Sequence, residues 1–230
     1  GAKTNPFKAL YKQFIESNKA TKSKATINSY GDTLAKLELF EAMKGEKVWL
    51  ERIDQAFYQR FLNFLIMDMQ YLNNTVGKHI KTLKVFINYL SDNNLLPNPI
   101  DVRKFKVLRE EPDVIHLTEE ELLAIYHCKN LTQEQEWAKD NFCFSCFTGL
   151  RYSDNIKVDR SHIKDTMIEI RTTKTKKAIF IPLNPFAKEI IKKYDNPNSN
   201  RPLPPVMHNV TANALLKEIA KTAGLNEQVR

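Results

Sequence analysis

The first half of the chain repeats large apolar residues every three or four positions, which places them on one face of an α-helix. Four stretches show this pattern, at residues 7–15, 27–37, 57–65 and 76–90. Ser23, Asp54 and the pair Asn73 and Asn74 precede the last three stretches, where short polar side chains cap helices. The pattern predicts a small bundle of four amphipathic helices.

The second half combines helical signals with one pair of strands. Thr118 and Thr132 each open a capping-box sequence, and Gly149 fits the end of the helix that follows Thr132. Residues 167–171 and 178–182 read as two strands joined by a polar turn. Further helices are expected after Ser153, Asn184 and Asn209.

Residues 97–113 contain three prolines, alternating charges and no clear period, so they read as a linker. The expected fold is therefore mainly α. One helical domain spans residues 1–96, the linker follows, and residues 114–230 form a second helical domain with a small β-hairpin.

The composition is that of an ordinary folded domain, with 42% hydrophobic and 27% charged residues. No apolar stretch approaches the roughly 20 residues that a membrane helix needs, and no signal peptide is visible. We therefore expect a cytoplasmic protein without membrane contact. Cys143 and Cys146 form a C-x-x-C in an apolar helical stretch without a second ligand pair, which favours reduced thiols over a metal site.

The net charge of +8 is concentrated in the first half. Residues 1–112 hold 18 basic and 12 acidic residues, and residues 113–230 hold 17 and 15. A basic half indicates a polyanionic partner, most simply nucleic acid, although a solvated basic surface is the plain alternative.

Several basic residues are candidates for contacts with DNA phosphates. Lys78 and Lys81 project away from the apolar stripe of the fourth helix, and Lys84 flanks it, with His79 nearby. Such a face is also common as a solvated lysine surface. Two more candidates lie in the linker, Arg103 and Lys104.

Arg151 stands where the helix after Thr132 ends and a short helix begins. A guanidinium beside helical N–H groups grips phosphate oxygens in a bidentate fork. Asp154 follows three residues later, and Lys174 lies in the hairpin turn, from which it can donate a proton. A structural ion pair between Arg151 and Asp154, and an ordinary turn lysine, are the alternatives.

These motifs resemble the tyrosine recombinase family of the phage-integrase type. The resemblance rests on T-G-L-R-Y-S-D at 148–154, on the strand–K-T-K–strand–I-P-L hairpin, and on the N-N-T-V-G-K-H-I-K-T-L-K-V-F-I helix at 73–87. The chain is most similar to integrases of mobile elements that carry a SAM-like core-binding domain. The first half then resembles that DNA-binding domain, and the second half resembles the first part of the catalytic domain.

The resemblance implies a function in DNA integration and recombination on duplex DNA. Arg151 matches the first catalytic arginine, Lys174 the general acid for the leaving 5′ oxygen, and Asp154 the acidic residue that supports the site. It further implies a 3′-phosphotyrosine intermediate, no metal or cofactor, and a tetramer on DNA.

The sequence departs from the family at the remaining catalytic residues. No H-x-x-R occurs in the 230 residues, and Tyr194 precedes the expected position of the nucleophile, in an apolar-periodic helix. We therefore expect that this chain alone is inactive and is part of a larger recombinase. The alternative is a catalytically inactive DNA-binding remnant or regulator at recombination sites.

Overall fold

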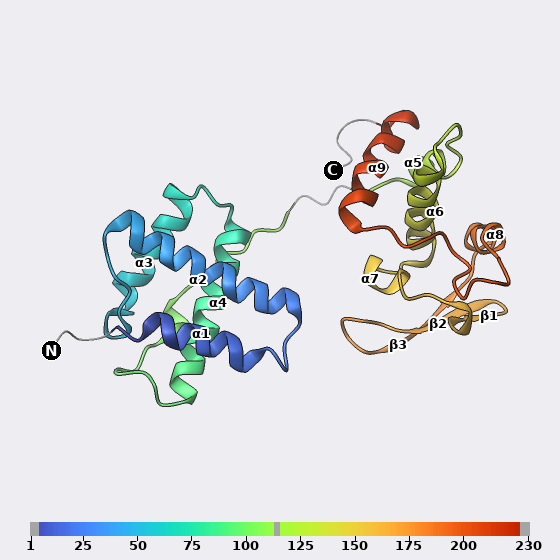
Figure 1. Cartoon of the computed structure of the whole chain (residues 1–230). Helices are drawn as coiled ribbons and strands as arrows, with labels where there is room; N and C mark the ends of the chain where they lie inside the picture. Colours follow the sequence, from blue (N-terminus) through green and yellow to red (C-terminus); the bar gives the residue numbers. More distant parts are fainter. Residues whose placement is uncertain (1–4, 113–115, 226–230) are drawn as a thin grey trace. The chain divides into compact units, whose positions relative to one another are not determined.

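The computed structural model describes residues 5–112 and 116–225, and the chain divides into two compact units, Gly1–Pro112 and Asp113–Arg230 (Figure 1). Each unit has its own hydrophobic core. The expected mainly α fold with a small sheet is confirmed.

Unit 1 contains the four expected helices. They are α1 (Phe7–Asn18), α2 (Lys24–Lys44), α3 (Gln55–Asn63) and α4 (Asn73–Asp92), with the short turns η1 (Leu50–Arg52), η2 (Phe64–Asp68) and η3 (Val102–Lys104). Ser23 and Asp54 cap α2 and α3 as predicted, because each side chain accepts a backbone N–H of the first turn. Leu72, and not Asn73 or Asn74, occupies the position before α4.

Aromatic rings form much of the core of unit 1. Tyr11 and Phe14 of α1 pack on Phe86 of α4, and Phe40 of α2 meets Phe61 of α3 edge to face. All five side chains are at most 1% exposed. Burial of such rings is the main favourable term in the stability of a helical bundle this small.

The region predicted to be a linker is largely packed against unit 1. We call residues 104–110 the strap. Phe105 is 1% exposed and stacks on Tyr58, whose hydroxyl donates to the carbonyl of Lys106 at 3.0 Å. Lys84 of α4 donates to the carbonyl of Phe105 at 2.9 Å. The strap therefore belongs structurally to unit 1, whereas the sequence pattern suggested a free connection.

The strap continues along α4 toward the start of that helix. The amide group of Asn74 donates to the carbonyl of Glu110 and accepts its N–H, at 2.8 and 3.0 Å. Between these bonds and Lys84 lies Gly77, where a Cβ atom would stand 2.0 Å from the carbonyl oxygen of Leu108. Only glycine permits this approach of strap and helix.

Unit 2 is helical around one small sheet. Its helices are α5 (Glu119–Tyr126), α6 (Gln133–Thr148), α7 (Tyr152–Asn155), α8 (Pro185–Lys193) and α9 (Asn209–Thr222), with a 3₁₀ turn η4 (Arg160–His162). Strands β1 (Ile163–Lys164), β2 (Met167–Arg171) and β3 (Ala178–Pro182) pair antiparallel in the order β1-β2-β3. The two longer strands have the predicted bounds, and β1 was not anticipated.

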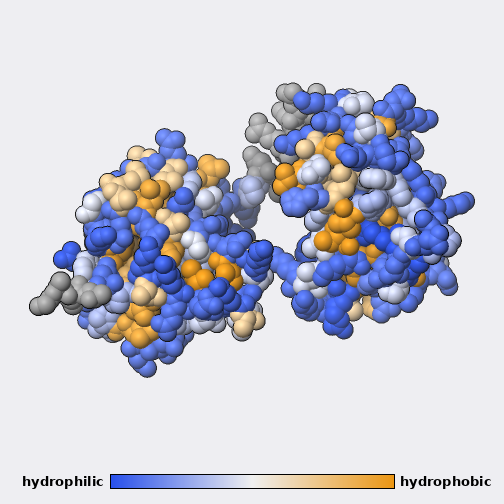
Figure 2. All heavy atoms as spheres, viewed as in Figure 1, coloured by the Kyte–Doolittle hydropathy of each residue, from blue (hydrophilic) through white to orange (hydrophobic). Residues whose placement is uncertain are grey.

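The sheet packs on the helices through one face. Ile168 and Ile170 of β2 are at most 3% exposed and join the core of unit 2, while the intervening positions face outward. In Figure 2, hydrophobic surface is also visible on unit 2 between α7 and α9. Phe142 and Leu216 are among the residues that line a groove there.

Replacing Gly77 with Ala should destabilise unit 1 by about 2 kcal/mol, because the new methyl group overpacks the contact with the strap. Gly31, inside α2, has open space around its Cβ position, so Gly31→Ala should be neutral or stabilising by up to about 1 kcal/mol. Unfolding in urea, followed by Trp49 fluorescence in a Trp137→Phe background, reads unit 1 alone. Equal stability of the two variants would contradict the strap contact.

Candidate functional site

Arg151 lies at a supported turn of unit 2. Helix α6 ends at Gly149, whose φ of 68° reverses the chain, and the next residue, Leu150, is 4% exposed and fixes the turn in the core. Arg151 precedes α7 and is exposed. Its guanidinium has no hydrogen bond or ion pair with any residue in the described ranges, so it is available to a ligand.

One detail of this turn differs from the sequence prediction. Arg151, and not Ser153, occupies the capping position of α7, and its side chain makes no capping bond. The helix has only four residues, Tyr152–Asn155. The favourable dipole expected for an anion at its start is therefore small, and the guanidinium itself must supply most of the attraction.

A network of hydrogen bonds around Asn155 holds α7 in place. Asn155 donates to the carbonyl of Asn141 and to the hydroxyl of Ser145, both in α6, at 3.0 and 2.6 Å. Arg201 donates to the backbone carbonyl and the side-chain oxygen of Asn155, at 2.8 and 3.0 Å. The turn that carries Arg151 is thus anchored to α6 and to the loop before α9.

Arg201 was not anticipated from the sequence. Its guanidinium donates five hydrogen bonds, and the acceptors besides Asn155 are the carbonyls of Val158 and Pro204 and the side chain of Asn141. Burial lowers the pKa of Arg201 to about 10. The only sequence signal was an arginine inside a Pro- and Asn-rich loop.

Asp154 connects α7 to the hairpin. It is 1% exposed, and its Oδ1 accepts the backbone N–H of Thr173 at 2.7 Å. The hydroxyl of Thr173 donates to the carbonyl of Ser153 at 3.2 Å. Since Lys174 follows Thr173 in an exposed turn, these bonds join the element that carries Arg151 to the element that carries Lys174.

The carboxyl group of Asp154 is stabilised in its ionised form. Burial raises its pKa, but the hydrogen bonds from Thr173 and the charges of Arg151 and Lys157 outweigh that effect and leave the pKa below its usual value. Arg151 therefore lowers the pKa of Asp154 through its charge. Within the described part of the chain the two residues form no direct ion pair, which the alternative of a structural Arg151–Asp154 pair required.

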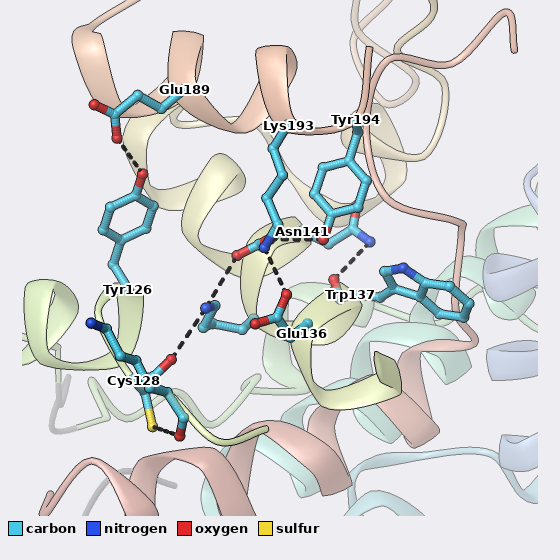
Figure 3. Close-up of polar contacts among 11 residues, drawn as sticks. Tyr126, Cys128, Glu136, Trp137, Asn141, Glu189, Lys193 and Tyr194 are labelled. Atoms are coloured by element: carbon cyan, nitrogen blue, oxygen red, sulfur yellow. Dashed lines mark hydrogen bonds and ion pairs between the residues drawn. The ribbon is translucent and has the colours of Figure 1, made fainter. Parts of the chain in front are cut away.

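The three tyrosines of unit 2 have hydroxyl groups that are already hydrogen-bonded. Tyr194 donates to Asp140 at 2.8 Å, Tyr126 to Glu189 at 2.7 Å, and Tyr152 to the carbonyl of Met207 at 2.5 Å. Figure 3 shows the hydroxyl of Tyr126 pointing at Glu189.

The environment of Tyr194 disfavours its phenolate. Burial, its hydrogen bond to the buried Asp140 and the charges of Asp140 and Glu136 raise its pKa. Lys193 also donates to Oδ2 of Asp140, at 2.7 Å, so this carboxylate oxygen accepts from both residues. Tyr194 therefore connects the end of α8 to α6.

The predicted DNA-binding residues of α4 do not share one exposed face. Lys78 and Lys81 are exposed, and Lys78 pairs with Asp32 of α2 at 3.0 Å. Lys84 is half-buried against the strap. His79 is 3% exposed, so its expected place beside the lysines is wrong. Its ring accompanies the apolar stripe because it stands three positions after the buried Val76.

His79 ties α4 to α2 from inside the unit. Its Nδ1 shares a hydrogen bond with the hydroxyl of Thr33 at 3.0 Å. Tyr71 stacks on its ring, with 5.8 Å between the ring centroids. Burial, together with the charges of Lys78 and Lys36, lowers the pKa of His79 to about 4. The imidazole is therefore neutral in the folded protein near pH 7.

The remaining candidates lie on η3 at the start of the strap. Arg103 and Lys104 are exposed, and Arg103 pairs with Asp101 at 2.8 Å. Such exposed pairs are weak, because water screens them, so a phosphate can replace the carboxylate. Over the described residues, no group of His, Cys, Asp and Glu is arranged to hold a metal ion, and no helix is long and apolar enough to cross a membrane.

The family model of the phage integrase SAM-like domain matches residues 6–106, which is nearly all of unit 1. Among solved structures, a lambda integrase tetramer bound to a Holliday junction has a TM-score of 0.74 at 17% identity, covering 98% of this chain and 72% of that one. A lambda integrase (75–356) dimer bound to a COC′ core site gives 0.73 at 18%, covering 95% and 81%.

A further match is the Tn1549 transposon integrase (82–397) in complex with circular intermediate DNA. Its TM-score is 0.67 at 12% identity, covering 98% of this chain and 83% of that one. At these identities the likeness shows the fold. No curated protein matches the sequence.

The stability of unit 1 should fall as the pH is lowered from about 6.5 toward 4. The unfolded state binds a proton on His79 near its ordinary pKa of 6.5, whereas the folded state resists protonation down to about 4. His79→Gln should remove this component, while His116→Gln, an exposed histidine of unit 2, should not. Urea unfolding of unit 1 at each pH measures the difference; parallel curves for the wild type and His79→Gln would refute it.

Proposed function

We propose that this chain, whose residues 6–106 match the phage integrase SAM-like domain and whose fold resembles lambda and Tn1549 integrases, is a site-specific recombinase chain acting on duplex DNA. Unit 1 serves as the core-binding domain, and unit 2 supplies part of the catalytic domain. The observation that carries the proposal is the bond between Asp154 and Thr173, which joins the elements of Arg151 and Lys174.

Arg151 binds the scissile phosphate in this proposal. Its exposed guanidinium has no protein partner in the described part of the chain, while its backbone is anchored through Leu150 and α7. A fixed guanidinium fork binds two non-bridging oxygens and stabilises the charge that develops on them during displacement.

Lys174 protonates the leaving group. An attacking tyrosine oxygen forms a bond to phosphorus and loses its proton to a base, while the bond from phosphorus to the 5′ oxygen breaks. Lys174 gives its ammonium proton to that oxygen, and its exposed place in the hairpin turn allows the approach. The phosphate stays bound to tyrosine, so its bond energy is kept for rejoining.

Unit 1 contributes affinity through phosphate contacts. Lys81 is exposed and has no ion-pair partner among the described residues, while Lys78, Arg103 and Lys104 stand exposed on α4 and η3. Related folds are seen as dimers and a tetramer on DNA, and we propose that this chain also self-associates there. His79 and Lys84 act within the fold instead.

A DNA-binding regulator without cleavage is the second candidate. It is favoured by the hydrogen-bonded hydroxyls of all three tyrosines of unit 2. Both candidates bind DNA, but only the recombinase predicts strand cleavage that depends on Arg151.

Lys81→Ala should weaken binding to duplex DNA several-fold and reduce the salt slope of log Kd by about one, as expected for the loss of one phosphate contact. Lys8→Ala is the matched control, because Lys8 already pairs with Glu38 on another helix. Fluorescence anisotropy between 50 and 300 mM salt, roughly the range in which phosphate contacts respond, measures both. An unchanged slope for Lys81→Ala would remove α4 from the interface.

Arg151→Ala, made in the product of the complete gene, should lower single-turnover cleavage by about 100-fold or more and leave DNA affinity within a few-fold. Arg151→Lys should also be strongly impaired, because lysine lacks the planar fork. Lys188→Ala controls for the loss of one exposed charge in unit 2. If the wild type binds DNA but never cleaves it, the regulator is the better account; if Arg151→Ala cleaves normally, the phosphate role is wrong.

A further inference from the structure

The turn between β2 and β3 has hydrogen bonds that set its own shape. Thr172 donates its N–H to the carbonyl of Lys177 at 2.9 Å, and its hydroxyl meets that of Thr175 at 2.7 Å. Lys176 adopts a φ of 57° and donates to the carbonyl of Thr172 at 3.0 Å. None of these bonds reaches α7, so they leave open where the turn lies relative to Arg151.

Thr173 alone makes the hydrogen bonds that join the described turn to α7. Its N–H reaches Oδ1 of Asp154 at 2.7 Å, and its hydroxyl reaches the carbonyl of Ser153 at 3.2 Å. The first bond fixes the position of the turn. The second bond, from a different atom of the same residue, fixes how the turn is rotated about the first.

The bond to Asp154 resists breaking because the carboxylate is buried. Asp154 is 1% exposed, so movement of the turn would leave an ionised group without its backbone donor and away from water. The turn therefore has one favoured place, and Lys174 takes its direction from Thr173, the residue directly before it.

We propose that Thr173 is a positioning residue, which holds Lys174 where its ammonium group meets the leaving 5′ oxygen beside Arg151. This inference rests on the proposed function. The backbone bond to Asp154 is open to any residue, but the bond to Ser153 needs a hydroxyl. Serine should therefore substitute for Thr173, and the isosteric valine should not.

The docking of the turn is measured first, on this chain without DNA. Thr173→Val should speed hydrogen exchange of the amide at position 173 about fivefold, the effect of losing one neutral hydrogen bond. Thr173→Ser should preserve slow exchange. Thr166→Val, an exposed threonine of the neighbouring turn, is the matched control and should change nothing. Unchanged exchange in Thr173→Val overturns the proposal.

The catalytic consequence is measured with the product of the complete gene. Thr173→Val should slow cleavage about tenfold on a normal substrate, with DNA affinity unchanged. A substrate with sulfur in place of the leaving 5′ oxygen should restore the rate. A thiol has a pKa of about 8.5, so the sulfur leaves as a thiolate without a proton donor. An equal defect on both substrates would show that Thr173 does not act through Lys174 and overturns the proposal.

Failure of the proposed function gives a different result. Lys174→Ala should lose cleavage on the oxygen substrate and regain it on the sulfur substrate. If Lys174→Ala cleaves the oxygen substrate normally, the general-acid role falls even when exchange at position 173 responds as expected. Thr173 is then only a structural contact of the turn.

Discussion

The carboxylate of Asp154 determines how α7 and the β2–β3 turn of unit 2 lie relative to each other. It is buried and ionised, which is tolerable only while the N–H of Thr173 and the nearby positive charges compensate for the lost water. That requirement couples the short helix α7 to the hairpin, two elements with few other contacts. The proposed function needs such a coupling, since the proposed phosphate-binding residue and the proposed proton donor come from different elements.

Unit 1 uses polar contacts for a different purpose, to attach irregular backbone to a helix. The side-chain amide of Asn74 pairs with the backbone N–H and carbonyl of Glu110, and Lys84 donates to the carbonyl of Phe105. These bonds satisfy main-chain groups that a packed loop would otherwise leave without partners. Lys84, a lysine that the sequence offered for DNA contact, is thereby committed to the fold, so fewer lysines of α4 are available for the proposed contacts than its sequence suggests.

Most local signals were interpreted correctly from the sequence, although the caps expected before α4 and at Ser153 were wrong, and long-range contacts were not predicted. The capping boxes at Thr118 and Thr132 and the reversal at Gly149 depend on neighbouring residues, so helix bounds followed from the chain alone. The strap did not, because its contacts join backbone carbonyls to residues far away in sequence. His79 was predictable, since it stands three positions after Val76 and four before Leu83 on the buried stripe.

The candidate site divides in the same way. The T-G-L-R-Y-S-D motif located Arg151 and Asp154, and the hairpin pattern located Lys174. The partner of Asp154 and the anchors of α7 appear only in three dimensions, because Thr173 and Arg201 lie 19 and 46 residues from the groups that they bind. Sequence reasoning named the candidate reactive groups, whose roles stay predictions, and missed the residues that hold them in place.

Arg201 has an electrostatic consequence beyond its structural role. Its five hydrogen bonds go to neutral oxygens, and in the described ranges no carboxylate pairs with it. Dipoles solvate its charge without cancelling it, so a full positive charge remains beneath α7 where mobile ions have limited access. Its field reaches the surface and makes the neighbourhood of Arg151 more attractive to a polyanion than the exposed side chains alone would.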